Sequence, residues 1–157
     1  MIVLRYSGGT ANTDPNASLG GAMSSAGFTS AVVGNLFDNV PLVEAGADHR
    51  CFYVVNLTGR MVGGVVVFVA VPTVLADTEF DIGLDPAAVG SDSTTLISTE
   101  GEAPAGVTFS RPTTVGTGLV IGDIPAGSRK AVWVRRTVSA ARAAGSDTGT
   151  IRFSGVG

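Results

Sequence analysis

His49 and Cys51 form the one pair in this sequence that resembles a catalytic thiol with its base. Residues two apart on a β-strand point to the same side, so the imidazole could activate the thiol. No third group that would orient the imidazole is evident, and an apolar run over 52–55 follows directly. As metal ligands, the pair is two short of a structural zinc site. We therefore expect Cys51 to be an ordinary core thiol and the chain to be no enzyme.

A second candidate site is a set of acidic residues that share odd numbering and hence one face of a strand: Asp77, Glu79, Asp81 and Asp85. Carboxylates bind hard cations, but calcium sites use a tight loop, whereas a strand spreads alternate side chains about 6.6 Å apart. We expect a solvated or arginine-paired face, and neither a metal nor another cofactor.

Trp133 and Arg135 share one side of a further candidate strand, because strand neighbours face opposite ways. Arginine stacked on an aromatic ring can serve binding or packing. We predict that these two residues, together with the outward acids Glu79 and Asp81, lie on surfaces available for contacts between subunits.

The elements that position these residues are short and rich in β-branched side chains. Charged residues make up 15% of the 157, and 22 are glycine, a profile that favours sheets and turns. From Arg50 onward, apolar runs alternate with turn clusters at the spacing of an all-β sandwich. The candidate strands are Ile2–Tyr6, Arg50–Leu57, Gly64–Val71, Thr78–Leu84, Thr94–Ser98, Gly106–Ser110, Gly118–Ile121, Arg129–Val138 and Thr148–Ser154.

We predict a single antiparallel β-sandwich over residues 49–157, immunoglobulin-like, with a jelly roll as the alternative. Within it, alternation places Phe80, Ile82 and Leu84 inward. The run 65–71 has no polar alternation, so both of its faces should be covered, by the segment 32–43 or by another subunit.

Residues 1–48 are predicted to form an N-terminal arm and docking segment. Between 7 and 31, only Leu19, Met23 and Phe28 fall outside the small and polar types, so we expect an extended arm that uses these three as anchors on neighbouring subunits. Residues 32–43 concentrate apolar side chains, Leu36 and Phe37 among them, and should form a short turn or helix that docks elsewhere.

Charge and hydropathy exclude several partners. The net charge of −3 gives no positive field for nucleic acid or for an anionic membrane. The longest uncharged apolar run, between Arg60 and Asp77, falls short of the ~20 residues that span a bilayer. A lone cysteine forms no internal disulfide, and the sequence starts without the pattern of a secretory signal.

Several longer motifs resemble a family of small virion structural proteins of tailed bacteriophages. They are Ser18-Leu-Gly-Gly21, Asn35-Leu-Phe-Asp-Asn-Val40, Phe80-Asp-Ile-Gly-Leu-Asp-Pro86, Ala103-Pro-Ala-Gly-Val-Thr-Phe-Ser110, Gly118-Leu-Val-Ile-Gly-Asp-Ile-Pro-Ala-Gly-Ser128 and Ala131-Val-Trp-Val-Arg-Arg-Thr-Val138. The resemblance spans nearly the whole chain and carries over no catalytic residue.

The resemblance implies a virion protein assembled in the host cytoplasm. We expect a homo-oligomeric head decoration or cement protein that binds the major capsid protein or other virion proteins. A neck, tail or baseplate component is the nearest alternative. A host-surface or carbohydrate-binding module would show exposed aromatic loops, and a small hydrolase would place His49 or Cys51 in a cleft.

Overall fold

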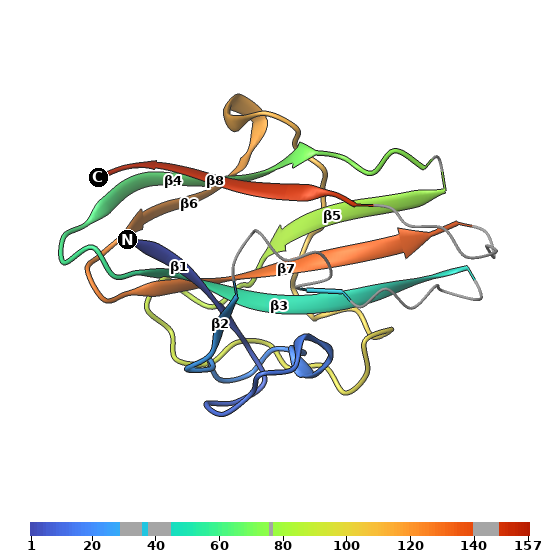
Figure 1. Ribbon diagram of the computed structural model, residues 1–157, viewed down its shortest axis with the longest axis horizontal. Helices are drawn as coiled ribbons and strands as arrows, with labels where there is room; N and C mark the ends of the chain where they lie inside the picture. Colours follow the sequence, from blue (N-terminus) through green and yellow to red (C-terminus); the bar gives the residue numbers. More distant parts are fainter. Residues whose placement is uncertain (29–35, 38–44, 76, 140–147) are drawn as a thin grey trace.

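The computed structural model describes residues 1–28, 36–37, 45–75, 77–139 and 148–157, which form two antiparallel sheets packed as a sandwich (Figure 1). The five-stranded sheet has the order β2-β1-β3-β7-β5, and the three-stranded sheet has the order β6-β4-β8. The strands are β1 Ile2–Tyr6, β2 Gly27–Phe28, β3 Gly46–Asn56, β4 Val62–Val71, β5 Thr78–Leu84, β6 Leu119–Ile124, β7 Arg129–Val138 and β8 Thr150–Val156.

The all-β sandwich is confirmed, but two of the expected strands are wrong. Thr94–Ser98 and Gly106–Ser110 each make a single bridge, Gly20 with Leu96 and Ile82 with Ser110. Both stretches lie in the long connection from β5 to β6, whose only regular element is the short 3₁₀ turn η2, Val115–Thr117. A β-rich run becomes a strand only where a partner backbone pairs with it over several residues, and each of these runs forms one isolated bridge.

The central pair of the five-stranded sheet is β3 with β7, in register from Gly46 opposite Val138 to Val55 opposite Arg129. Along both strands, even-numbered residues face the three-stranded sheet and odd-numbered residues face away from it. Phe52 and Val132 are thus in the core between the sheets, whereas Cys51 and Trp133 lie on the outer face of the five-stranded sheet.

The core between the sheets is built mainly from valine, isoleucine and phenylalanine. Val67 and Val69 of β4 face Ile82 of β5, and Phe80 and Leu84 pack against the same cluster, so the predicted inward positions on β5 are confirmed. On the other face of β4, Phe68 is buried and Val66 is half-buried. The predicted double coverage of this strand is therefore partial.

A second core covers the outer face of the five-stranded sheet. Cys51, Tyr53 and Trp133 are buried there beneath two connections, one within residues 7–26 and the other within 85–112. These connections form the layer below β3 in Figure 1. Ile97, Phe109 and Leu19 come from them. The sandwich thus has a covering layer of its own chain on one side.

The extended arm predicted for residues 7–31 is wrong for its described part, 7–28. The buried Ser7 hydroxyl donates to the Cys51 carbonyl (2.8 Å) and accepts from the Gly20 amide (3.0 Å). Gly20 has φ +92°, and a Cβ there would overlap the Thr95 carbonyl oxygen. Small residues allow the backbone to lie directly on the sheet, and hydrogen bonds replace the missing apolar bulk.

β1 and β2 belong to the same sheet as β3, so the described residues before 48 are part of the sandwich. Among the described residues, no helix is long and apolar enough to cross a membrane.

Candidate interaction surfaces

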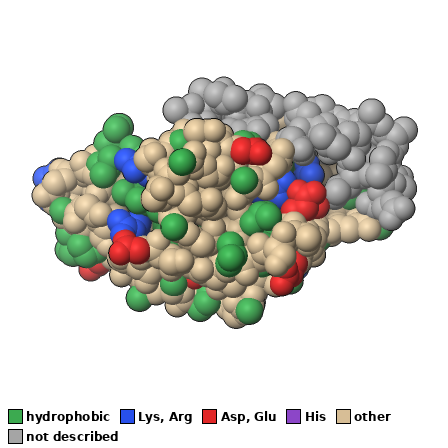
Figure 2. All heavy atoms as spheres, turned by 90° about the horizontal axis from the view of Figure 1, so that it is seen from below, with side chains coloured by type: hydrophobic (Ala, Val, Ile, Leu, Met, Phe, Trp, Pro, Cys, Tyr) green, Lys and Arg blue, Asp and Glu red, His purple; other side chains and the backbone are tan. Residues whose placement is uncertain are grey.

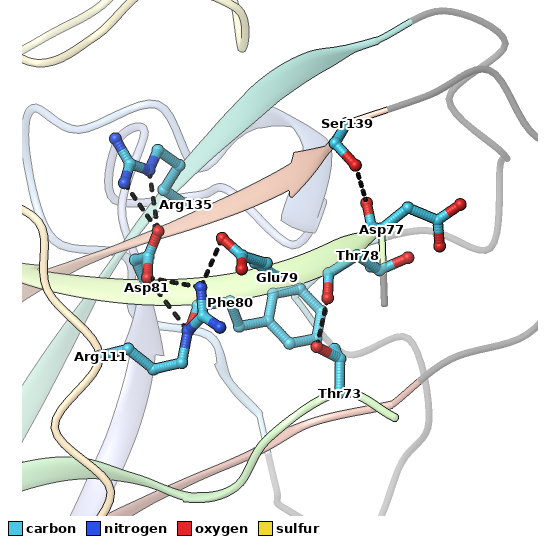
Figure 3. Close-up of polar contacts among 9 residues, drawn as sticks. All are labelled: Thr73, Asp77, Thr78, Glu79, Phe80, Asp81, Arg111, Arg135 and Ser139. Atoms are coloured by element: carbon cyan, nitrogen blue, oxygen red, sulfur yellow. Dashed lines mark hydrogen bonds and ion pairs between the residues drawn. The ribbon is translucent and has the colours of Figure 1, made fainter. Parts of the chain in front are cut away.

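Glu79 and Asp81 form an ion-pair network with two arginines on the outer face of the five-stranded sheet (Figure 3). Asp81 Oδ1 accepts from Arg111 Nε (3.2 Å) and Nη2 (3.1 Å), and its Oδ2 accepts from Arg135 Nε (3.2 Å) and Nη2 (2.7 Å). Arg111 also reaches Glu79 at 2.6 Å. These contacts confirm the arginine-paired alternative for the two acids.

The network fastens the covering layer to the sheet. Arg111 belongs to that layer, and its Nε also donates to the Phe80 carbonyl on β5 (3.1 Å). The Arg135 guanidinium lies 4.9 Å from the centre of the Phe109 ring, a cation–π contact. The Glu79 hydrogen bond raises the pKa of Arg111; burial opposes the shift, and the interactions with Asp81 add to it. Two acids and two arginines balance, so the network leaves no net charge for a partner.

Trp133 lies on the same side as Arg135, as predicted, but the expectation that it is on the surface is wrong. Its side chain is fully buried, and its Nε1 donates to Asp85 Oδ2 (2.8 Å). Asp85 Oδ1 accepts from the Ala87 amide (2.9 Å). Lys130 Nζ donates to the Asp85 carbonyl (2.6 Å) and to that of Ala87. Burial lowers the pKa of Lys130, and the Asp85 charge opposes that shift.

This buried node of Asp85, Lys130 and Trp133 was missed by the sequence analysis. A buried indole N–H requires an acceptor, and Lys130 is the single lysine of the chain. These two facts indicate that Trp133 and Lys130 need hydrogen-bond acceptors, but they do not identify Asp85 as the residue that supplies them. The node ties the turn after β5 to β7.

His49 and Cys51 point to the same outer face but do not act on each other. His49 Nδ1 donates to the Glu100 carbonyl (3.0 Å), and its ring packs against Phe109 (5.4 Å between centroids). The Cys51 sulfur lies 4.0 Å from the Thr94 hydroxyl. Burial raises the pKa of the Cys51 thiol and lowers the pKa of His49. A thiol held protonated is a poor nucleophile.

Five of the expected interface residues pack inside the chain itself. Leu19 and Met23 contact the outer core, and Phe28 stacks on Tyr6 (4.8 Å). Leu36 and Phe37 are the described residues of the segment 32–43, and both are buried in the core between the sheets. The rest of that segment lies outside the described residues. Contact of these five with a partner stays a prediction.

Phe37 is held at one end of the sandwich by aromatic and cation–π contacts. Its ring stacks on Phe80 (5.6 Å), and the guanidiniums of Arg50 and Arg136 lie 5.3 Å and 4.9 Å from its centre. Arg136 pairs with Asp48 (2.6 Å), and the fully buried Arg50 pairs with Glu100. These charges therefore also have partners within the chain.

Besides Leu96 on the covering layer and Val71 and Val74 at and after the end of β4, exposed large apolar side chains occur in two groups. Val115 and Val120 are exposed on the outer face of the three-stranded sheet. A second group, Met1, Leu57, Met61 and Val156, lies at the end of the sandwich that carries both chain termini. Figure 2 looks onto the covering layer and shows hydrophobic side chains spread over this face, its left-hand end included, with small groups of charged side chains among them.

No protein-family model matches the chain, and the curated proteins contain no match to it.

Proposed function

We propose that this chain is a non-enzymatic structural protein of a tailed-bacteriophage virion, working as a decoration or cement protein on the head. The sequence motifs support the virion assignment by resemblance. The choice of attachment surface rests on a difference between the two sheets. The chain covers the outer face of the five-stranded sheet, whereas Val115 and Val120 are exposed on the outer face of the three-stranded sheet.

The register defines this exposed face. Val120 on β6, Val66 on β4 and Ser154 on β8 lie opposite one another in one outward row. The side chain of Val120 is 69% exposed, and Val115 of η2 is also exposed. A Cβ at Gly118 would overlap Val66 Cγ1, so the segment after η2 lies close against this row. We name Val66, Val115 and Val120 the valine face.

Contiguous exposed apolar surface marks interaction sites on soluble proteins. A sheet face can rest on a lattice of the major capsid protein without an enclosed pocket, and burial of valines there would contribute favourably to attachment. Protein partners in the virion are thus the expected occupants of the valine face.

The test compares Val120→Asp with Leu96→Asp. Leu96 is 70% exposed but lies on the covering layer of the opposite sheet, which makes it a matched control. Binding of each purified variant to particles that lack the protein would be measured by co-sedimentation. We expect Val120→Asp to weaken binding by roughly tenfold or more, because an interface core excludes charge. Equal binding by both variants would show that the valine face is not the attachment surface.

The number of copies in each purified virion separates the head from other locations. Many copies support a head lattice protein. A few copies would instead favour the neck, tail or baseplate, and would overturn the decoration role while keeping the virion assignment.

We also propose that the sandwich is immunoglobulin-like. The order β1-β3-β7-β5 supports this, because it reproduces the A-B-E-D sheet of that fold, and β4 beside β8 reproduces the C-F pair. β6 departs from the pattern, since it follows β5 in the chain yet borders β4. No described strand takes the place of the final G strand.

A further inference from the structure

The two sheets have four edge strands, and three of them are protected from pairing with another backbone. β2 is very short, with only the residues Gly27–Phe28. The edge of β5 is occupied at Ile82 by Ser110. β6 contains a bulge opposite Val65–Val66, where it has one residue more than its partner strand. Short length, cover and bulges are the features that keep a sheet edge from adding a further strand.

β8 is the edge strand that lacks these features. Its seven residues include no proline and no lysine, and Arg152 is its single charge. It pairs with β4 in unbroken register between Ile151 and Ser154, and both register shifts of this pair place the extra residue on β4. Within the described part of the chain, no hydrogen bond reaches residues 150–156 from any element other than β4. The outer row of β8 amides and carbonyls is therefore open to an extended backbone.

The side chains beside this edge are apolar and incompletely covered. Phe153 of β8 points into the core between the sheets, where its ring lies edge-on to that of Phe52 on β3 (5.9 Å). Phe52 also contacts Phe28 of β2 (5.7 Å), so these three rings join β8 to the far edge of the five-stranded sheet. Phe28, Phe153 and Ile151 are each half-buried. An apolar side chain placed next to Phe153 would cover more of this surface.

The arrangement of the two sheets selects the kind of partner. Because β8 lies over β3, the five-stranded sheet extends past it by β1 and β2. Two copies joined at β8 would therefore collide, since each five-stranded sheet would extend beneath the other copy's β8. A single strand, about 4.8 Å from β8, fits above β1 and β2 without such a collision.

We propose that the β8 edge binds one extended segment of another protein, which adds a fourth strand to the three-stranded sheet. The alternation along β8 defines the chemistry of that segment. Every second side chain is apolar and faces the core beside Ile151 and Phe153, and an acidic side chain on the other face lies opposite Arg152. The edge is separate from the valine face, so the inference does not depend on the proposed virion role.

The probe is an end-blocked heptapeptide in which threonine alternates with valine and one threonine is replaced by glutamate. Paired antiparallel along the whole of β8, it places valines opposite Ile151 and Phe153 and the glutamate opposite Arg152. Titration into the full chain is followed by NMR of the backbone amides. We expect saturable binding with the largest shifts on β8. A peptide of the same composition with its valines consecutive should bind roughly tenfold more weakly, because it cannot turn all of them to the core.

Methylation of the peptide amides tests whether the peptide adds as a strand. A strand bound along one edge uses the amides of alternate residues only. Methyl groups on one alternate set should therefore weaken binding by roughly tenfold or more, and methyl groups on the other set should change it little. Binding that survives both methylations, or is lost with both, overturns strand addition.

A charge exchange tests the register. Arg152→Glu should weaken binding of the glutamate peptide by roughly twofold to fivefold and strengthen binding of its lysine counterpart by a similar factor. Arg60→Glu, at an exposed arginine on the turn between β3 and β4, is the matched control and should change neither affinity. Circular dichroism melts show whether both variants are folded. Equal effects of the two substitutions overturn the pairing with Arg152.

Two further outcomes would reject the β8 edge as a site for a donated strand. One is the absence of binding up to the solubility limit of the peptide. The other is a concentration-dependent dimer of the wild type, without peptide, that shifts the β8 amides, because a second copy would then be the occupant of the edge.

Discussion

Burial governs the ionisation of the two residues that most resemble catalytic groups. Cys51 is fully buried between Trp133 and the covering layer, and its thiol meets the Thr94 hydroxyl rather than a base. His49 Nδ1 donates a hydrogen bond to the Glu100 carbonyl. Packing therefore favours the neutral form of both side chains. We expect the thiol to react, and the imidazole to bind a proton, more readily when the protein unfolds.

Cys51 is predicted to resist thiol reagents in the native state. Both burial and the raised pKa disfavour the reactive thiolate. Reaction with a disulfide reagent should be about a thousandfold slower, or slower still, than in denaturant, because global unfolding costs about 5–15 kcal/mol. The measurement is the rate of reagent release with and without urea. Rapid labelling of native protein would contradict the buried position.

His49 is predicted to make stability depend on pH below its ordinary pKa of 6.5. Burial lowers the folded-state pKa, so the unfolded chain binds the proton more readily, and the free energy of unfolding decreases as pH falls through 6.5. The charges of Arg135 and Arg50 lower the pKa further, and the Glu100 carbonyl and the charge of Asp48 oppose the shift. Urea unfolding of wild type and His49→Asn on either side of that pH isolates the effect. An identical pH dependence in both proteins would contradict it.

At the scale of elements, the covering layer packs closely against the edge strand β5. Ser110 exchanges backbone hydrogen bonds with Ile82 (2.9 Å and 3.0 Å), and Arg111 holds Asp81 next to it. These contacts occupy part of the β5 edge, which protects that edge from pairing with another chain. This close packing depends on Gly83, because a side chain there would meet Val107 and Thr108.

Gly83→Ala is predicted to lower the free energy of unfolding by about 1–3 kcal/mol, the usual cost of overpacking. The added Cβ would lie 2.5 Å from Val107 Cγ1 and 2.9 Å from the Thr108 carbonyl oxygen. Gly116→Ala is the control, since a Cβ there meets nothing within 4 Å. Its effect should stay within about 0.5 kcal/mol. Denaturant midpoints compare the two, and equal midpoints would count against this close packing.

At the scale of the whole molecule, the chain stacks three layers: the three-stranded sheet, the five-stranded sheet and the covering layer. The outer core would be open to water without residues 7–26 and 85–112. The N-terminal segment is therefore part of the folded unit. Its backbone bonds to both neighbouring parts of the fold: the Ser18 carbonyl accepts from the Cys51 amide on β3 (2.8 Å), and the Gly21 amide donates to the Thr95 carbonyl (3.3 Å).

Deletion of residues 1–28 is predicted to prevent folding. It removes six apolar side chains that pack on the two cores: Ile2, Val3, Leu4, Leu19, Met23 and Phe28. Each contributes up to about 1.5–3 kcal/mol, and together they approach the whole stability of a domain, about 5–15 kcal/mol. The readouts are solubility and near-ultraviolet circular dichroism. A soluble, cooperatively folding truncation would restore the extended-arm hypothesis.

Hydrogen exchange gives an independent measure in the intact chain. The Gly21, Cys51 and Ile97 amides join the segment to other parts of the fold, with the Thr95, Ser18 and Leu19 carbonyls as acceptors, so they should be protected in dilute, monomeric protein. The Gly59 amide, which lies on an exposed turn, serves as the unprotected reference. Exchange of the three amides at the reference rate would show that the segment is not docked.

Local pattern by itself determined the strands whose side chains alternate or are uniformly β-branched. β1, β5 and β7 have the predicted bounds, and the inward positions of Phe80 and Ile82 followed from a period of two. The same periodicity placed Trp133 and Arg135 on one face. It also indicated that Glu79 and Asp81 would lie on the face of β5 that points away from the core between the sheets.

Only the tertiary structure decided what covers that face. The partners of Asp81 are 30 and 54 residues away, and those of the Ser7 hydroxyl are 13 and 44 residues away. Periodicity describes neighbours along one element and carries no information on which distant loop crosses it. A segment of glycine and serine therefore looked too polar to dock. It docks because small residues allow close backbone approach and buried hydroxyls satisfy the amides they meet.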